Sequence, residues 1–217
     1  MLFRSYAGLL TLAGFEKPMY YFRKGLWSSE KFCKIFTAVS EEDYWNRPWL
    51  ESWNYASGTK VDVRVFSNED EVELFVNGKS AGKANPKEKG FAEFTIDYEE
   101  GEISVKASSS DDVIVTTGAA VAFNATVVSG EEVQQIEVSV VDDLDNPVVT
   151  DSSLITVETE GCVLAGIENG DLADVTEYSA NYRHAYNGKL IVYVKKCSDN
   201  ASVTFKSAGK TELTVEV

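Results

Sequence analysis

Aromatic side chains that suit sugar binding gather in one stretch of this sequence, residues 41–55. Trp45, Trp49 and Trp53 recur every four residues, and Tyr55 follows them. Flat aromatic rings offer an apolar face on which a sugar ring can stack, so the stretch predicts a carbohydrate-binding platform. Clustered aromatic residues are more often buried in a core or an interface, and packing is the preferred interpretation.

A second group of candidate binding residues lies in the long segment 169–187. It contains Tyr182, Arg183 and His184, the one histidine of the chain. Long ordered loops in compact domains are often functional, so Tyr182 and Arg183 are candidate sugar contacts. His184 has no serine or cysteine nucleophile beside it in the sequence, and a lone histidine is no catalytic triad.

An acidic turn, residues 142–146, is the candidate calcium site. Asp142, Asp143, Asp145 and Asn146 supply hard oxygen ligands. The spacing, the central glycine and the terminal glutamate of an EF-hand loop are missing, however. We therefore interpret these side chains as solvated turn residues and predict no metal site.

The three cysteines, Cys33, Cys162 and Cys197, are too few and too far apart for a disulfide framework or a zinc site. They are predicted to be buried free thiols, with a facing Cys162 and Cys197 pair as the alternative. Neither a phosphate-binding loop nor a dinucleotide fingerprint occurs. The sequence therefore predicts no cofactor.

Composition limits the classes of protein and of partner. A chain of 217 residues suits one or two domains, and 44% hydrophobic with 25% charged residues are globular values. A formal net charge of −15 argues against nucleic acid and anionic membranes as partners. No stretch is apolar enough to span a membrane, and no signal peptide opens the chain. In an excised C-terminal piece that says nothing about export, so periplasmic, extracellular and cytoplasmic locations all stay open.

The elements that would position these residues are strands. Residues 61–65 and 72–76 alternate between apolar and polar side chains, which is typical of half-buried strands. Asn77-Gly78 then predicts a two-residue type I′ hairpin turn. Further alternating runs predict about seven strands from Lys31 to Thr117 and about seven more after Gly118. The pattern predicts an all-β fold of two tandem immunoglobulin-like sandwiches, residues 31–117 and 118–217.

The first 30 residues differ from the rest. Pro18 suits a first helical turn, and Met19, Phe22 and Leu26 follow at helical spacing, which predicts a helix over 18–26. So short a helix with so many aromatic residues should pack on a partner surface.

Several motifs resemble one enzyme family in the same order. Residues 67–80, SNEDEVELFVNGKS, followed by Gly82, resemble the "sNaeeVELflNGkSlG" hairpin of the immunoglobulin-like module behind the catalytic barrel of bacterial family 2 glycoside hydrolases. Residues 13–28 are similar to the segment that leaves that barrel, except that Pro18 replaces a frequent acidic residue. Residues 140–148, and 166–171 with 186–189, resemble turns of the later domains.

This resemblance implies that residues 1–30 are a barrel-end remnant and that the catalytic carboxylates lie outside the chain. The implied function is a non-catalytic accessory region of a β-galactosidase-like enzyme, inactive alone, that braces the barrel and shapes substrate access. The barrel is then the main partner, with carbohydrate and a second copy as further partners. A carbohydrate-binding module and a bacterial adhesion module are the alternatives. The barrel-exit motif argues against the adhesion module.

Overall fold

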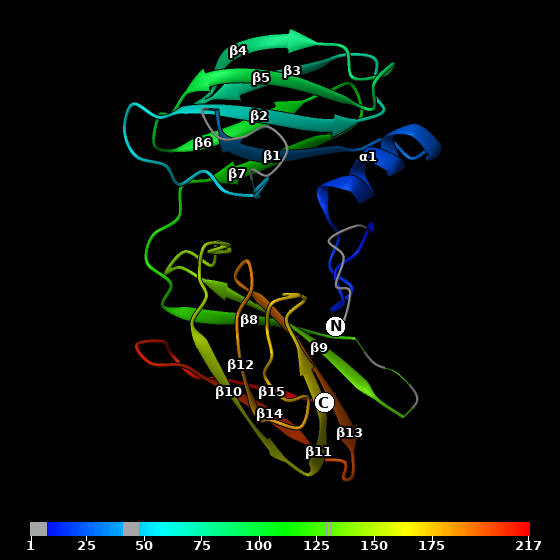
Figure 1. The fold of residues 1–217 in the computed structure, drawn as a ribbon, viewed down its shortest axis with the longest axis vertical. Coiled ribbons are helices and arrows are strands. Elements are labelled where there is room, and N and C mark those ends of the chain that lie inside the picture. Colours follow the sequence, from blue (N-terminus) through cyan, green and yellow to red (C-terminus); the bar gives the residue numbers. More distant parts are fainter. Residues whose placement is uncertain (1–7, 41–47, 129, 131) are drawn as a thin grey trace. The chain divides into compact units, whose positions relative to one another are not determined.

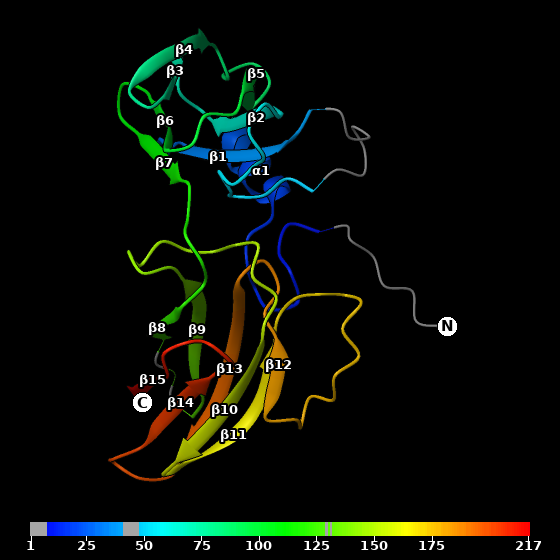
Figure 2. The same cartoon turned by 90° about the vertical axis from the view of Figure 1, so that its left-hand side faces the viewer.

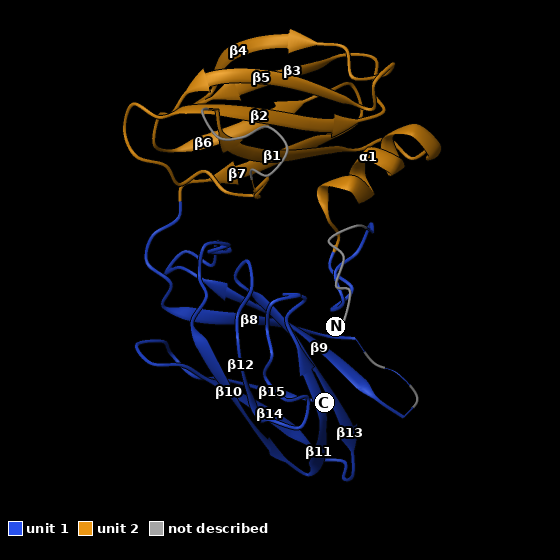
Figure 3. Ribbon diagram, in the orientation of Figure 1, with its two compact units in different colours: residues 1–15, 117–217 blue, residues 16–116 orange. Residues whose placement is uncertain are grey.

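Two compact units divide the chain (Figure 3). The computed structural model describes residues 8–40, 48–128, 130 and 132–217. Residues 16–116 form one unit, here called the N-terminal sandwich, and the described residues of 1–15 and 117–217 form the other, the C-terminal sandwich. Segment 1–30 is thus divided between the units after Phe15. Strands dominate both units, so the predicted all-β class with a short N-terminal helix is confirmed.

Two antiparallel sheets of three and four strands make up the N-terminal sandwich (Figure 1). Their strand orders are β1-β2-β5 and β4-β3-β6-β7. The strands are β1 (Cys33–Val39), β2 (Lys60–Ser67), β3 (Val72–Val76), β4 (Lys79–Ala84), β5 (Phe91–Asp97), β6 (Glu102–Lys106) and β7 (Asp111–Val115).

The core of the N-terminal sandwich is built by the alternation seen in the sequence. Val61, Val63 and Val65 of β2 have no exposed surface, and they belong to one apolar cluster with Leu74 of β3 and Val105 of β6. Successive strand residues point to opposite faces, so one face of each sheet supplies this core. The other face of the β1-β2-β5 sheet remains available for a second layer.

Helix α1 (Pro18–Trp27) provides that second layer. Its side chains Tyr21 and Phe22 pack against a separate aromatic cluster that contains the buried Phe36 of β1 and Phe66 of β2. The helix begins with a proline, as predicted, and the N–H of Ser28 caps its end by donating to the carbonyl of Lys24 at 2.9 Å. The expectation that the aromatic residues of this segment need an outside partner is therefore wrong for Tyr21 and Phe22.

The β3–β4 hairpin has the turn that Asn77-Gly78 predicts. Both residues have positive φ, +49° and +75°, and Val76 pairs with Lys79 across the turn. Asparagine and glycine tolerate this left-handed conformation better than other residues. The Asn77 side chain also donates to the carbonyl of Glu100 at 3.0 Å and accepts from the N–H of Glu102 at 2.8 Å. One turn residue thus fixes two neighbouring turns.

The C-terminal sandwich has two antiparallel sheets of four strands, with orders β12-β10-β14-β15 and β11-β13-β9-β8. Its core holds the inward residues of both sheets, such as Ile136, Val192 and Phe205. The prediction of about seven strands missed β12, which has only three residues. The strands are β8 (Ala122–Val128), β9 (Gln134–Val141), β10 (Leu154–Glu160), β11 (Cys162–Glu168), β12 (Tyr182–His184), β13 (Lys189–Lys196), β14 (Ser202–Lys206) and β15 (Leu213–Glu216).

Replacing Asn77 tests the hairpin. Asn77→Ala removes two hydrogen bonds and places a residue that disfavours positive φ in the turn, so we expect unfolding to require about 1–3 kcal/mol less free energy. Urea unfolding followed by tryptophan fluorescence measures this, because the buried Trp53 reports on the N-terminal sandwich. Lys79→Ala, an exposed residue of the same hairpin, is the control. Equal unfolding midpoints for the two variants would contradict the assignment.

Candidate functional sites

The predicted aromatic platform does not exist as one surface. Trp53 has no exposed surface, and its indole Nε1 donates to the carbonyl of Glu99 at 2.9 Å inside the core. Trp49 packs instead on the outer aromatic cluster, with the Arg64 guanidinium 4.2 Å from its ring centre. Trp45 lies outside the described residues. The structure therefore removes Trp53 as a sugar contact and separates it from Trp49.

Tyr55 is a packing residue in this structure. Its ring meets Trp53 edge to face at 6.1 Å between centroids, and its hydroxyl lies 2.7 Å from the hydroxyl of Thr37. The ring is half-buried, since it packs against the core of the N-terminal sandwich. Of the four candidates in residues 41–55, only Trp49 and Tyr55 are described with some exposed surface.

The two candidates on β12 point in opposite directions. Tyr182 is 47% exposed, whereas Arg183 is buried. The Arg183 guanidinium donates to the carbonyl of Thr176 at 2.8 Å and lies 3.4 Å from a carboxylate oxygen of Asp174. Arg183 therefore holds the loop 169–181 against the sheet and does not face solvent as a sugar contact.

Glu168 completes this buried ionic cluster. Its Oε1 accepts the backbone N–H groups of Asn169 and Gly170 at 2.9 and 3.0 Å, and it lies 3.7 Å from Nη1 of Arg183. Two carboxylates thus share one guanidinium, which offsets much of the cost of burying the three charges. Nε of Arg183 is buried without a hydrogen-bond partner among the described residues.

The same cluster changes the pKa of the Asp174 carboxyl group. Burial acts to raise its pKa, but hydrogen bonds from Thr176 and Asn169 and the charge of Arg183 outweigh burial. The pKa of Asp174 therefore lies below its usual value, and the group stays ionised at neutral pH. An ionised Asp174 can pair with the Arg183 guanidinium.

A cavity of about 450 Å³ lies beside this cluster. Seven residues line it: Leu12, Ala165, Gly166, Ile167, Glu168, Tyr178 and Tyr193. They come from the N-terminal segment, from β11 and β13, which pair side by side (Figure 2), and from the loop before β12. Sequence reasoning selected the loop but chose Tyr182 and Arg183, which do not line this cavity.

In the acidic turn, the Asp142 side chain is hydrogen-bonded to backbone N–H groups. The Asp142 carboxylate accepts from the N–H groups of Gly118, Leu144 and Asn146 at 2.9 to 3.0 Å. Those donors already use the lone pairs that a calcium ion would need. No group of three or more metal-ligating side chains occurs among the described residues. We therefore propose no metal here.

The cysteines differ in exposure. Cys33 is buried, Cys162 is half-buried and Cys197 is exposed, and all three are free. The prediction of buried thiols is thus correct for Cys33 and wrong for Cys197. Burial raises the pKa of the Cys33 thiol, against the opposing effect of its side-chain hydrogen bonds with Ser110 and Ser67. Cys33 is therefore a poor nucleophile.

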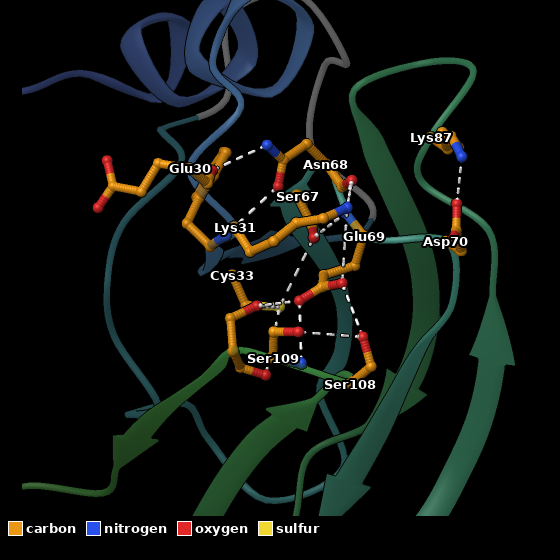
Figure 4. Close-up of polar contacts among 12 residues, drawn as sticks. Glu30, Lys31, Cys33, Ser67, Asn68, Glu69, Asp70, Lys87, Ser108 and Ser109 are labelled. Atoms are coloured by element: carbon orange, nitrogen blue, oxygen red, sulfur yellow. Dashed lines mark hydrogen bonds and ion pairs between the residues drawn. The ribbon is translucent and has the colours of Figure 1, made fainter.

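A buried carboxylate at Glu69 is the site that sequence reasoning missed (Figure 4). Its oxygens accept hydrogen bonds from the hydroxyls of Ser108 and Ser110 at 3.0 Å and from the N–H of Ser109 at 3.1 Å. Lys31 Nζ lies 3.7 Å away. The run of three serines in the β6–β7 turn was the available signal, since such a run can solvate a buried charge.

Asn68 extends this Glu69 cluster toward the start of β1. Its side-chain amide donates to the carbonyls of Ser28 and Glu30 at 2.9 and 2.8 Å. The motif Ser67-Asn68-Glu69 therefore ties the β2–β3 turn to the end of α1 and to the β6–β7 turn. These contacts hold the elements in place, and they occupy most of the polar atoms that could otherwise bind a substrate.

Two family descriptions match the chain. Residues 58–115 match a domain of unknown function, DUF4982, and residues 122–216 match "Glycoside hydrolase family 2 C-terminal domain 5". Among curated proteins, the beta-galactosidase BoGH2A of Bacteroides ovatus is 26% identical over 229 aligned positions, which cover 98% of this chain and 25% of that protein. A putative beta-glucuronidase of Formosa agariphila is 35% identical over 97 residues, 43% of this chain and 8% of that protein.

Solved structures share the fold. A glycosyl hydrolase family 2 member from Bacteroides cellulosilyticus superposes with a TM-score of 0.87 at 22% identity, covering 98% of this chain and 32% of that one. A beta-glycosidase from Bacteroides vulgatus superposes with a TM-score of 0.84 at 20% identity, covering 97% and 28%. The chain thus spans about a quarter to a third of the length of these relatives, and the structural likeness shows the fold.

Removing the Glu69 charge tests the cluster that it organises. In Glu69→Gln an amide group would face donors, so we expect a loss of about 1–3 kcal/mol of stability in the N-terminal sandwich. Asp70→Asn is the matched control, since Asp70 is the exposed neighbour paired with Lys87. Tryptophan-monitored urea unfolding should separate the variants. If both unfold like the unsubstituted chain, Glu69 does not organise these turns.

The lowered pKa of Asp174 predicts a pH dependence. A carboxyl whose pKa is lower in the folded state adds stability above its unfolded pKa, near 3.8, and this stability is lost as the pH falls through the folded value. Asp174→Asn should therefore make the backbone of β12, which carries Arg183, exchange hydrogen faster than in the unsubstituted chain at pH 7. This difference in exchange rate should become smaller below pH 4. Glu177→Gln removes an exposed charge from the same loop and serves as control. If the difference in exchange rate between Asp174→Asn and the unsubstituted chain does not change with pH, the charge of Asp174 does not stabilise this region.

Proposed function

We propose that this chain, which belongs to the C-terminal region of glycoside hydrolase family 2, is a non-catalytic accessory region that braces the catalytic barrel of a longer enzyme. The proposal is supported by an apolar patch on α1, made of Met19, Leu26 and Trp27 and here called the helix patch. Trp27 is 73% exposed, and the other two side chains are also exposed. Large apolar side chains gathered on one short helix indicate a surface that another protein part covers.

The geometry of α1 explains why the helix patch is left open. Tyr21 and Phe22 use one side of the helix to pack on the aromatic cluster of the sheet. Met19 and Leu26, seven residues apart, lie nearly above one another at the edge of this side, next to Phe22, whereas Trp27 lies on the side turned away from Tyr21 and Phe22. A Cβ atom at Gly25 would approach the carbonyl of Gly90 to 2.9 Å, so this glycine sets the close contact of helix and sandwich. The helix is thus anchored on one side and free to bind on another.

The barrel is the proposed occupant, and the resemblance of the segment before and through α1 supports this choice. Residues 13–28 are similar to the exit from a family 2 barrel, and the chain covers only 25% of the length of the Bacteroides ovatus relative. Leu9, Leu10 and Leu12, which precede α1 in the sequence, are exposed too. Exposed apolar residues thus concentrate in the part of the chain that would join a barrel.

The charged groups support an accessory role over an independent hydrolase. A retaining glycosidase needs one ionised carboxylate and one protonated carboxyl on either side of the scissile bond. In the ionic cluster, Glu168 and Asp174 share Arg183, and the pKa of Asp174 is lowered. Asp174 is therefore ionised at neutral pH and is not a proton donor there. We expect the chain alone to hydrolyse neither aryl β-galactosides nor aryl β-glucuronides.

Trp27→Ser, made both in the isolated chain and in the longer enzyme, tests the proposal. In the isolated chain we expect a change within about 0.5 kcal/mol, because the side chain is already exposed. In the enzyme the change should remove about 1.5–3 kcal/mol of burial and lower the thermal unfolding midpoint, with faster loss of hydrolysis on heating. Calorimetry and aryl-glycoside assays on both proteins measure this.

Leu144→Ser is the matched control, since Leu144 is 76% exposed in the acidic turn. It should leave both proteins unchanged. Equal midpoints of the two variant enzymes would overturn the bracing role. Sedimentation of the isolated chain supplies a second check, because a dimer that Trp27→Ser dissociates would assign the helix patch to a second copy.

A further inference from the structure

We propose that the cavity beside β11 and β13 is a binding site for a neutral pyranose sugar, with Tyr178 as the stacking ring and Glu168 as the hydrogen-bond acceptor. The site belongs to the C-terminal sandwich alone. It shares no residue with the helix patch, although Leu12 in its wall is also one of the exposed apolar residues that precede α1. The site is tested on the chain without a barrel, so it does not rest on the bracing role. It also differs from the sugar contacts that the sequence predicts, because neither Tyr182 nor Arg183 lines it.

Strand geometry explains why a hollow forms here. Val192 and Val194 of β13 point into the core, so Tyr193 between them points to the outer face of the sheet. Gly166 lies directly across from Tyr193, next to a bulge in β11. Glycine has no side chain to fill the space beside the tyrosine ring. The floor of the cavity is therefore formed by the backbone of Gly166 and the phenol ring of Tyr193.

The walls combine apolar and polar groups in the way that a sugar requires. Tyr178, 64% exposed, and Leu12 offer apolar surfaces for the C–H face of a pyranose ring. Tyr178 is itself held in place, since the Arg183 guanidinium lies 5.3 Å from its ring centre. A few polar groups within a mostly apolar lining are typical of small-molecule sites, and about 450 Å³ falls within their range of roughly 300–1,000 Å³.

Glu168 supplies the polar end of the site. Within the part of the chain that the structure describes, its hydrogen bonds and its ion pair all use Oε1. Oε2 is then the oxygen left for a ligand hydroxyl. Arg183 and the two backbone donors hold this carboxylate in one orientation, and hydrogen bonds to a carboxylate are stronger than those between neutral groups.

The charge of the site selects a neutral ligand. Burial, together with the nearby carboxylates of Glu168 and Glu137, raises the pKa of Tyr193, so its phenol remains a hydrogen-bond donor at neutral pH. A uronic acid would bring a carboxylate toward Glu168 and Glu137, and like charges at close range are repulsive. A neutral sugar meets no such penalty. The arrangement therefore favours neutral pyranosides over uronides.

Saturation-transfer NMR on the 217-residue chain tests the site with three probes: methyl β-galactopyranoside, methyl β-glucopyranoside and methyl β-glucuronide. Tryptophan fluorescence would not report on it, because all four tryptophans precede residue 54. We expect at least one neutral probe to bind and the uronide to bind at least tenfold more weakly. No binding by either neutral probe, or tighter binding of the uronide, would overturn the proposal.

Variants locate the binding. Tyr178→Ala should weaken it at least fivefold, while Tyr182→Ala, an exposed tyrosine four residues away, and Trp49→Ala should leave it unchanged. Gly166→Ala gives a second test that preserves the fold, because the added methyl group meets only the Tyr178 carbonyl at 3.8 Å. It should also weaken binding by filling the hollow. Loss of binding in Trp49→Ala with no effect of Tyr178→Ala would place the sugar on the N-terminal sandwich and refute the site.

Discussion

The buried carboxylate of Glu69 is the constraint on which the N-terminal sandwich depends. A charge without water needs several donors, and here three serines of the β6–β7 turn and Lys31 supply them. Each donor comes from a segment far away in the sequence. Satisfying one charge therefore fixes where the β2–β3 turn, the β6–β7 turn and the start of β1 meet. The aromatic layer under α1 is built on strands that this arrangement holds.

In the C-terminal sandwich, buried charged groups are stabilised by ion pairing. Arg183 is buried between Glu168 and Asp174, and its position on β12 ties a long loop to the sheet. Buried ionic groups are costly in themselves, so their value lies more in selecting one loop conformation than in net stability. That selection matters here because the fixed loop carries Tyr178 to the edge of the cavity. A structural cluster thus shapes the surface that we propose as the sugar site.

The regular parts of the fold could be predicted because local physics determines them. Alternation in residues 61–65 and 72–76, the Asn77-Gly78 turn and Pro18 at the helix start each specify a conformation without distant contacts. The positions of the Trp49 and Trp53 side chains in the fold could not be predicted from local sequence. A spacing of four residues implies one shared surface only on a regular helix or strand, and the chain between these two residues is irregular apart from an isolated bridge of Leu50 to Thr37.

Candidate sites were harder to predict than strands because a polar side chain carries no local signal of its partners. Asp142 was predicted to be a solvated turn residue and Arg183 a sugar contact, yet both are buried among hydrogen-bond partners or counter-ions, as is Glu69. The side chains best suited to chemistry are therefore used for positioning. What remains accessible is an apolar patch on a helix of one sandwich and a hollow on the outer face of a sheet in the other. Because the two surfaces share neither a residue nor an ionic cluster, the proposed sugar site and the proposed bracing surface can be altered, and tested, independently of one another.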